Sequence, residues 1–190
     1  MKYDHILLIA CFVFATVCVF FIPRGSALPF SPNASYEVCF TPGEDCTAQI
    51  VDTLNNAQKS ILVMAYSFTS LPILEALLDA KNRGVTIEVI LDKSQFETEK
   101  YSVSRFLHNQ DIPVWIDAKP TIAHNKVMIV DQGTVITGSF NFTRAAREKN
   151  AENVLIIQDK QLAQKYFDNW QKRKISSMIW KEYQSYKEKK

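Results

Sequence analysis

A segment in which apolar runs alternate with an amphipathic stretch constrains the fold of this chain most. Residues 60–66 (SILVMAY) form a nearly continuous apolar run of strand length, as in a strand that is buried on both faces. Residues 71–83 follow, with leucines at helical spacing and Gly84 positioned as a C-terminal stop, and residues 86–91 are a second apolar run. Strand, helix and strand in this order predict a βαβ unit.

The rest of the chain continues this alternation. Strands are predicted at residues 36–40, 114–116, 126–130, 134–137 and 153–158. Helices are predicted at residues 45–58, 101–109 and 161–180, the last as one long closing helix. We therefore expect an α/β fold in which a mixed β-sheet is flanked by helices on both faces.

The N-terminus carries an apolar segment that predicts export. Residues 6–22 are seventeen residues without a charge, and Gly25 and Ala27 stand two apart, as signal peptidase requires. We predict a signal peptide over residues 1–27, cleaved after Ala27. An uncleaved N-terminal anchor is the alternative, because seventeen residues are at the short end of a membrane span. The domain is then periplasmic or secreted, or it is membrane-anchored outside the cytoplasm, and the membrane is a partner only in the anchored case.

Charge separates a globular domain, residues 28–175, from a basic C-terminal tail, residues 176–190. Residues 28–170 carry 13 Lys and Arg against 17 Asp and Glu, whereas residues 171–190 carry 7 against 2. The tail also contains aromatic residues, a combination that suits a nucleic acid backbone or an anionic membrane surface. A solvated C-terminal helix is the simpler expectation.

Two cysteines remain after the export segment. Cys39 and Cys46 flank a stretch with the Pro-Gly chemistry of a tight turn. In an oxidising compartment they can pair as a local disulfide, and two free thiols are the alternative. No further Cys or His lies at a spacing that would complete a zinc site, so we expect neither a metal nor a cofactor.

Four polar side chains in one window indicate chemistry on a phosphodiester. His124 and Lys126 stand two apart at the start of a predicted strand, which places both on one face. Ser139 and Asn141 repeat this spacing on the next strand, after an Asp-Gln-Gly turn that favours antiparallel pairing. An imidazole beside a cation and neutral hydrogen-bond donors can attack phosphorus and stabilise its equatorial oxygens.

These residues match a known signature without a gap. The sequence His124-x-Lys126-x4-Asp131-x6-Gly138-Ser139-x-Asn141 is similar to the HxKxxxxDxxxxxxGSxN pattern of the phospholipase D superfamily. Residues 64–69, 138–143 and 151–153 also resemble the small bacterial EDTA-resistant endonucleases of that superfamily, and the resemblance covers residues 36–172.

The resemblance implies a phospholipase D-like fold and a metal-independent phosphodiesterase. In that family the motif histidine attacks phosphorus to form a phosphohistidine, and a second motif histidine protonates the leaving oxygen. This chain has one motif, since neither His5 nor His108 is followed by a lysine at the required spacing. By similarity, two chains form a homodimer and each supplies one His124 to a shared active site.

The resemblance also assigns roles to single residues. His124 is the nucleophile in one subunit and the general acid in the other, Lys126 and Asn141 hold the phosphate oxygens, and Ser139 assists that phosphate-binding pocket. Glu152 matches the acid that accepts a hydrogen bond from the far nitrogen of the histidine and fixes its tautomer.

Three further polar residues have less defined roles. Asp131 belongs to the motif and is counted with the catalytic residues, although its place at a turn favours a positioning role over a chemical one. Asp92 and Lys93 follow a predicted buried strand, where a solvated strand end is the simpler expectation and the rim of the cleft is the alternative.

Three functions are consistent with these residues. The first is a non-specific endonuclease that hydrolyses DNA, with RNA as a second substrate, and nucleic acid is then the partner. The second is a phospholipase D-type hydrolase of a phospholipid. The third is a binding module without catalysis, and the intact motif argues against it.

Overall fold

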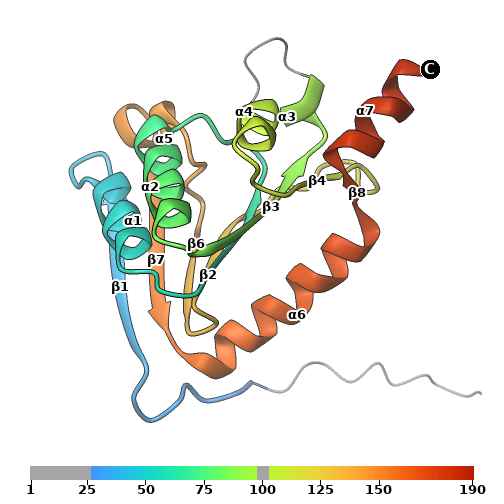
Figure 1. Ribbon diagram of the computed structural model, residues 1–190. Helices are drawn as coiled ribbons and strands as arrows, with labels where there is room; N and C mark the ends of the chain where they lie inside the picture. The colour runs from blue at the N-terminus through green and yellow to red at the C-terminus, as the bar shows by residue number, and fades with distance from the viewer. Residues whose placement is uncertain (1–26, 98–102) are drawn as a thin grey trace, which may run out of the picture.

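The computed structural model describes residues 27–97 and 103–190 (Figure 1). The predicted export segment, apart from Ala27, and the first two residues of the helix predicted at 101–109 therefore lie outside the described residues. Within the described part, no helix combines the length and hydropathy needed to span a membrane.

The described residues form one eight-stranded sheet with helices on both sides. The strands are β1 (Ser35–Thr41), β2 (Ser60–Ala65), β3 (Thr86–Asp92), β4 (Val114–Asp117), β5 (Lys126–Val130), β6 (Thr134–Gly138), β7 (Glu152–Gln158) and β8 (Met178–Ile179). The helices are α1 (Cys46–Asn55), α2 (Leu71–Asn82), α3 (Ser94–Glu97), α4 (Val103–Asn109), α5 (Arg144–Glu148), α6 (Lys160–Ser176) and α7 (Trp180–Glu188).

The sheet is mixed, and its order is β1-β7-β6-β5-β2-β3-β4-β8. The β2-α2-β3 segment is the predicted βαβ unit, with β2 parallel to β3 and β3 parallel to β4. Every other neighbouring pair is antiparallel. The predicted α/β class and mixed sheet are confirmed.

Each face of the sheet packs against its own set of helices. Buried residues of α1, α2, α4, α5 and α7 form the larger core on one face, and α6 crosses the other face (Figure 1). Trp170 of α6 is fully buried, and its indole N–H donates to the carbonyl of Val63 at 3.2 Å. Helices on both faces explain why β2 and β5 are apolar along nearly their whole length.

The prediction of one long closing helix over residues 161–180 is wrong. Helix α6 ends at Ser176, and the hydroxyls of Ser176 and Ser177 both donate back to the carbonyl of Arg173. Strand β8 then pairs with β4, and α7 starts at Trp180. Serine hydroxyls form hydrogen bonds with nearby backbone groups and thereby weaken a helix. A prediction from the spacing of apolar residues takes no account of this effect.

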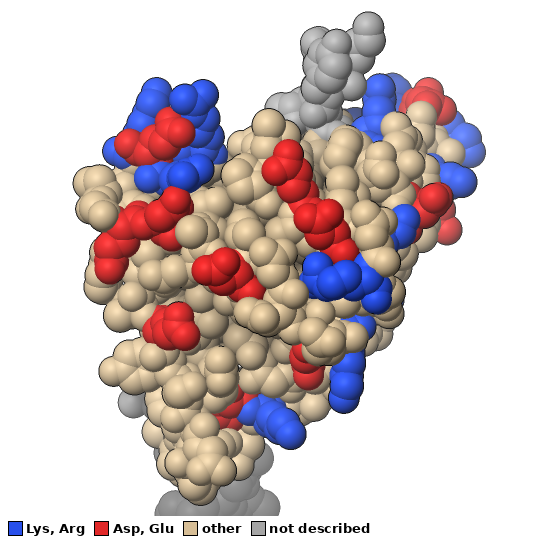
Figure 2. Space-filling view, turned by 60° about the vertical axis from the view of Figure 1, so that its left-hand side comes forward, with Lys and Arg blue, Asp and Glu red and all other residues tan. Residues whose placement is uncertain are grey.

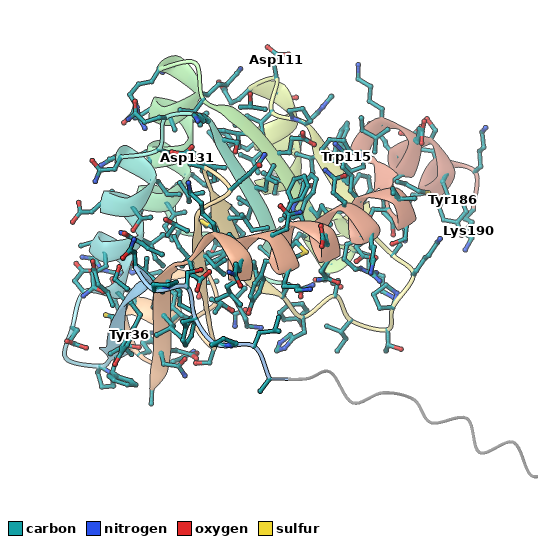
Figure 3. The ribbon with its side chains drawn as sticks, turned by 90° about the horizontal axis from the view of Figure 1, so that it is seen from below. Tyr36, Asp111, Trp115, Asp131, Tyr186 and Lys190 are labelled. Carbon is teal, nitrogen blue, oxygen red and sulfur yellow. A yellow bond between two sulfur atoms is a disulfide. The ribbon has the colours of Figure 1, made fainter. Side chains whose placement is uncertain are left out.

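The basic C-terminal segment packs on the domain through its aromatic residues. Trp180 and Tyr183 are buried, and the Trp180 ring stacks on His108 with centroids 4.4 Å apart. Tyr186 of α7 and Lys190, which follows this helix, are exposed and lie far from Asp131 (Figure 3).

A disulfide between Cys39 and Cys46 joins β1 to the first residue of α1, with Cα atoms 5.6 Å apart. Closing so short a loop restricts the unfolded chain by about 2.5 kcal/mol. The bond therefore fastens the end of an edge strand whose last residue, Thr41, pairs with Glu152.

Candidate active site

The candidate site lies at one edge of the sheet, where the parallel strands β2 and β3 end and the antiparallel β5 begins. The connection from β4 to β5, residues 118–125, brings His124 to this edge. Strand β5 covers Lys126–Val130, the range predicted from the sequence, and His124 lies two residues before it. His124 is exposed, whereas Lys126 is only 8% exposed.

His124, Lys126 and Tyr66 form one contact group. The Lys126 ammonium lies 3.0 Å from Nε2 of His124. An ammonium can only donate, so a hydrogen bond between these two atoms requires the tautomer in which Nε2 is unprotonated. The ring of Tyr66 packs on the imidazole with centroids 4.5 Å apart, and the ammonium lies 5.3 Å from the Tyr66 centroid. The nitrogen with the free electron pair thus lies next to the cation.

Burial lowers the pKa of Lys126 from its ordinary value of 10.5, and the nearby charge of Glu152 partly offsets this effect. A cation with a low exposed fraction interacts more strongly with an anion than a solvated lysine does, because less water screens it. Lys126 is therefore suited to hold a phosphate oxygen.

Ser139 and Asn141 lie on a loop and not on the strand predicted for them. Strand β6 ends at Gly138, which has φ +146°, and a Cβ there would lie 2.2 Å from the carbonyl oxygen of Asn153. Only glycine permits this approach, in which the N–H groups of Ser139 and Phe140 both donate to that carbonyl. The chain therefore stays bonded to the start of β7 for two residues beyond β6 and then reaches Phe68, with which Phe142 pairs.

Buried aromatic rings hold this loop. Phe140 and Phe142 are at most 2% exposed, and the Phe142 ring meets Phe68 edge to face at 5.7 Å. Asn141 stands between the two anchors, and its side-chain oxygen is buried without a hydrogen-bond partner among the described residues. The amide NH2 of Asn141 is the group that can donate to a phosphate oxygen, because the amide oxygen only accepts.

Glu152 has different partners from the one predicted. Its carboxylate accepts a 2.5 Å hydrogen bond from the hydroxyl of Ser139 and a 3.0 Å bond from the side-chain amide of Asn150, and it makes no bond to the His124 ring within the described chain. The Ser139 oxygen also accepts from the backbone and side-chain nitrogens of Asn153. Glu152 thus acts on this site through Ser139 and through its charge on Lys126.

Asp131 is separated from the other motif residues. It follows the far end of β5, about 16 Å along the strand from Lys126. Its carboxylate accepts hydrogen bonds from the backbone N–H groups of Gln58, Lys59 and Ser60 at 2.7–2.9 Å. These bonds join the β5-β6 turn to the start of β2, which agrees with the positioning role that its place at a turn favours.

Two residues of this edge were missed or misread from the sequence. Tyr66 was taken only as the end of a buried strand, although its position one residue beyond the β2 partner of Lys126 brings its ring to His124. Asp92 is not a solvated strand end, since it is 2% exposed. Within residues 27–97 and 103–190, no three His, Cys, Asp or Glu side chains are grouped as a metal ion would require.

Comparisons with known proteins agree with this fold and this motif. The family described as "Cardiolipin synthase, PLD-like domain" matches residues 50–174. A phospholipase D of Rickettsia typhi is 44% identical over 153 residues, which are 80% of this chain and 74% of the relative.

Two solved structures have the same fold. Nuc of Salmonella typhimurium, a phospholipase D family member, superposes with a TM-score of 0.72 at 37% identity, over 77% of this chain and 98% of its own. NucT of Helicobacter pylori superposes with a TM-score of 0.71 at 25% identity, over 77% of this chain and 99% of its own. The motif, the fold and these relatives agree, and the chain therefore belongs to the phospholipase D superfamily and is a phosphodiesterase of that superfamily.

Proposed function

We propose that the protein is an exported, metal-independent endonuclease that cleaves DNA, and also RNA, through a phosphohistidine. The observation that carries this proposal is the contact at 3.0 Å between Nε2 of the exposed His124 and the ammonium of the buried Lys126. A phosphate whose oxygen binds Lys126 lies within reach of that nitrogen, which is the arrangement that nucleophilic attack needs.

The reaction has two steps in this proposal. Nε2 of His124 forms a bond to phosphorus, the bond from phosphorus to the leaving oxygen breaks, and His124 of the second chain gives that oxygen a proton. The second imidazole, now neutral, takes a proton from water, the water oxygen bonds to phosphorus, and the bond from phosphorus to Nε2 breaks. Lys126 and Asn141 hold the equatorial oxygens in both steps.

The second histidine requires a second copy of the chain. The candidate site contains one imidazole, and the other described histidine, His108, is stacked on Trp180 at the base of α7. A symmetric homodimer that brings two copies of the site edge together supplies both histidines from one sequence position.

Nucleic acid is the substrate we favour, because residues 36–172 resemble the small bacterial endonucleases of the superfamily. A phospholipid is the second candidate, because the Rickettsia relatives are named phospholipase D. In Figure 2, acidic side chains are scattered across the middle of one face, and basic side chains gather toward its margins. Residues 28–170 have an excess of acidic residues, so attraction of a polyanion must come from local groups such as Lys126.

Cleavage of plasmid DNA in excess EDTA, by the purified protein and by His124→Asn, tests the function. We expect the wild-type protein to nick and linearise the plasmid and the variant to leave it intact. The same preparations are incubated with phosphatidylcholine and cardiolipin vesicles, and released headgroup is measured. Headgroup release without DNA cleavage would replace the nuclease by the phospholipase.

Mixing the two chains tests the shared site. Equal amounts of wild-type protein and His124→Asn are unfolded together and refolded, so that pairing is random. If each site needs two histidines, the activity per total protein falls to about one quarter of the wild-type value, because only dimers of two wild-type chains are active. If each chain acts alone, it falls only to about one half.

A further inference from the structure

The turn that carries His124 is bonded to the ends of two strands. Residues 118–125 leave β4 and pass the ends of β3 and β2 to reach β5, because the sheet order is β5-β2-β3-β4. The N–H of Ala123 donates to a carboxylate oxygen of Asp92 at 2.7 Å, and the N–H of Tyr66 donates to the carbonyl of Asn125 at 2.8 Å. His124 is therefore held through the residues on both sides of it.

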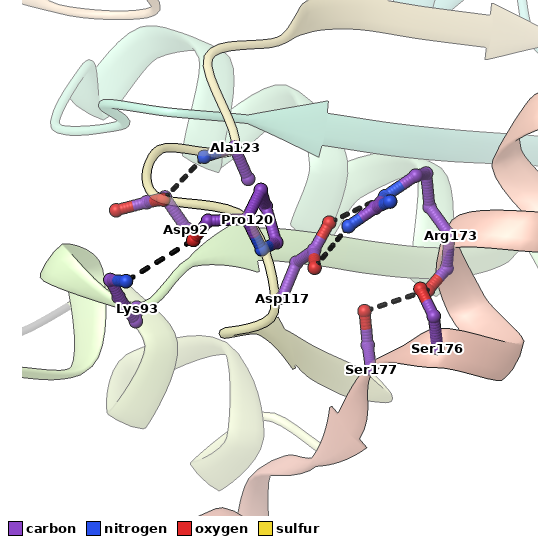
Figure 4. Close-up of polar contacts among 8 residues, drawn as sticks. All are labelled: Asp92, Lys93, Asp117, Pro120, Ala123, Arg173, Ser176 and Ser177. Atoms are coloured by element: carbon purple, nitrogen blue, oxygen red, sulfur yellow. Dashed lines mark hydrogen bonds and ion pairs between the residues drawn. The ribbon is translucent and has the colours of Figure 1, made fainter.

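Asp92 is built into this connection. It is the last residue of β3 and is 2% exposed, and its other carboxylate oxygen accepts from the N–H of Ser94 at 2.9 Å. The next residue, Lys93, donates from its ammonium to the carbonyl of Pro120 at 3.2 Å, earlier in the same loop (Figure 4). A buried carboxylate is costly unless it is hydrogen-bonded, and backbone N–H groups of this kind are the partners that stabilise it.

We propose that Asp92 is a positioning residue for the reaction, which fixes the reactive nitrogen of His124 by holding the N–H of Ala123. The inference rests on the role proposed above for His124. Without the carboxylate, the buried N–H of Ala123 has lost its partner, and the turn relaxes to recover one. A displacement of about 1 Å at a reacting atom is enough to lower a rate about 100-fold.

Asp117 provides a matched control. It ends β4 in register with Asp92, is 1% exposed and carries the same carboxylate. Its partner is the guanidinium of Arg173 on α6, whose Nε donates at 2.7 Å, and not the turn around His124 (Figure 4). Each substitution removes a buried carboxylate at the end of one of two neighbouring strands. Only the substitution of Asp92 removes a hydrogen bond from the turn that carries His124.

The kinetic test compares Asp92→Asn, Asp92→Ala and Asp117→Asn with the wild-type protein, using bis(4-nitrophenyl) phosphate as a simple phosphodiester. We expect kcat to fall about 10- to 100-fold in Asp92→Ala, with KM within about threefold and a smaller loss in Asp92→Asn, which keeps one acceptor oxygen. Asp117→Asn lowers the melting temperature but keeps kcat within about threefold. Equal losses of kcat at equal melting temperature in Asp92→Asn and Asp117→Asn would overturn the proposal.

A measurement without turnover separates this inference from the proposed function. The imidazole signals of His124 are recorded by NMR on histidine-labelled protein and identified by their absence in His124→Asn. Asp92→Asn is expected to shift or broaden them, and Asp117→Asn to leave them in place. Unchanged His124 signals in folded Asp92→Asn would refute the positioning role, whereas an inactive wild-type protein with shifted signals would refute only the function.

Discussion

The two ends of β5 differ in what their polar side chains bind. At the start of the strand, His124 and Lys126 are in contact with each other. Beyond the other end, Asp131 lies in a turn, and its carboxylate accepts hydrogen bonds from three backbone N–H groups. The first end has an exposed imidazole, a partly desolvated cation and, nearby, the buried unpartnered oxygen of Asn141. At the second end the carboxylate is already occupied within the fold. Five residues of buried strand separate the two.

The comparison teaches that one sequence motif serves two purposes. An exposed imidazole in contact with a partly desolvated ammonium can take up an anionic ligand, so the His124 end is the chemical end. A carboxylate bonded by backbone donors stabilises the fold and has little capacity left for a substrate. Activity and stability should therefore respond separately to substitutions at the two ends of β5.

The largest effect is expected at the chemical end. His124→Asn should lower the rate of plasmid cleavage by about 1000-fold or more, because it removes the nucleophile. Since His124 is exposed, the free energy of unfolding should change by less than about 1 kcal/mol. Initial cleavage rates and a urea unfolding curve measure the two quantities. A variant that keeps even a tenth of the activity would contradict the assignment.

Glu152→Gln should have the next largest effect, a fall in kcat of about 10- to 100-fold with residual activity. The amide removes the negative charge that raises the pKa of Lys126, so the pKa of Lys126 drops further below 10.5. If protonated Lys126 holds the phosphate, the alkaline limb of kcat/KM against pH moves to lower pH. Glu148→Gln, which removes only an exposed partner of Arg144, is the control, and an alkaline limb that moves equally in both variants would count against this role.

At the structural end, Asp131→Asn should reduce the free energy of unfolding by about 1–2 kcal/mol and leave kcat of the folded protein within about threefold. Asparagine tolerates the φ of +51° at this position. The loss of stability in Asp131→Asn therefore measures the contribution of the hydrogen bonds and not a change in backbone strain. Urea unfolding and plasmid cleavage on one preparation give both numbers. A large loss of kcat at unchanged stability would restore Asp131 to the catalytic residues.

The smallest effect is the pH dependence of the difference in free energy of unfolding between the wild-type protein and Asp131→Asn. Burial opposes the charge of Asp131, but the backbone N–H groups of Ser60, Gln58 and Lys59 outweigh it and lower the pKa below 3.8. A group with a lowered folded pKa stabilises the protein fully above about pH 4 and loses this contribution as the pH falls through the folded pKa. The stability gap between wild type and Asp131→Asn should therefore shrink from pH 5 toward about pH 3. A constant gap in urea unfolding would show that the charge is not involved.

Much of this molecule follows from the sequence. Apolar runs predicted β2, β3 and β5, and the leucine pattern before Gly84 predicted α2, because the burial of these residues depends on local periodicity. The spacing of His124 and Lys126 also predicted that their side chains share one face, because side chains two residues apart in an extended chain point the same way.

Other features depend on residues that are distant in sequence, and only the tertiary structure decided them. Glu152 bonds to Ser139 because β6 and β7 pair and Gly138 lets the next residues approach Asn153 closely, which no local pattern records. Strand β8 forms after α6 because its residues find a partner in β4, whereas the serines that end the helix are present in the sequence.

The setting of the histidine belongs to this second group. Asp92 is 31 residues from Ala123 in sequence, and a carboxylate after a strand gives no sign of whether it meets water or a backbone N–H. Asp92 meets the backbone N–H of Ala123 because residues 118–125 pass the ends of β3 and β2. The sequence by itself thus determined which chemical groups the protein carries and the order of its elements, whereas the packing of distant segments decided which groups are held still, because hydrogen-bond partners are selected by distance in space.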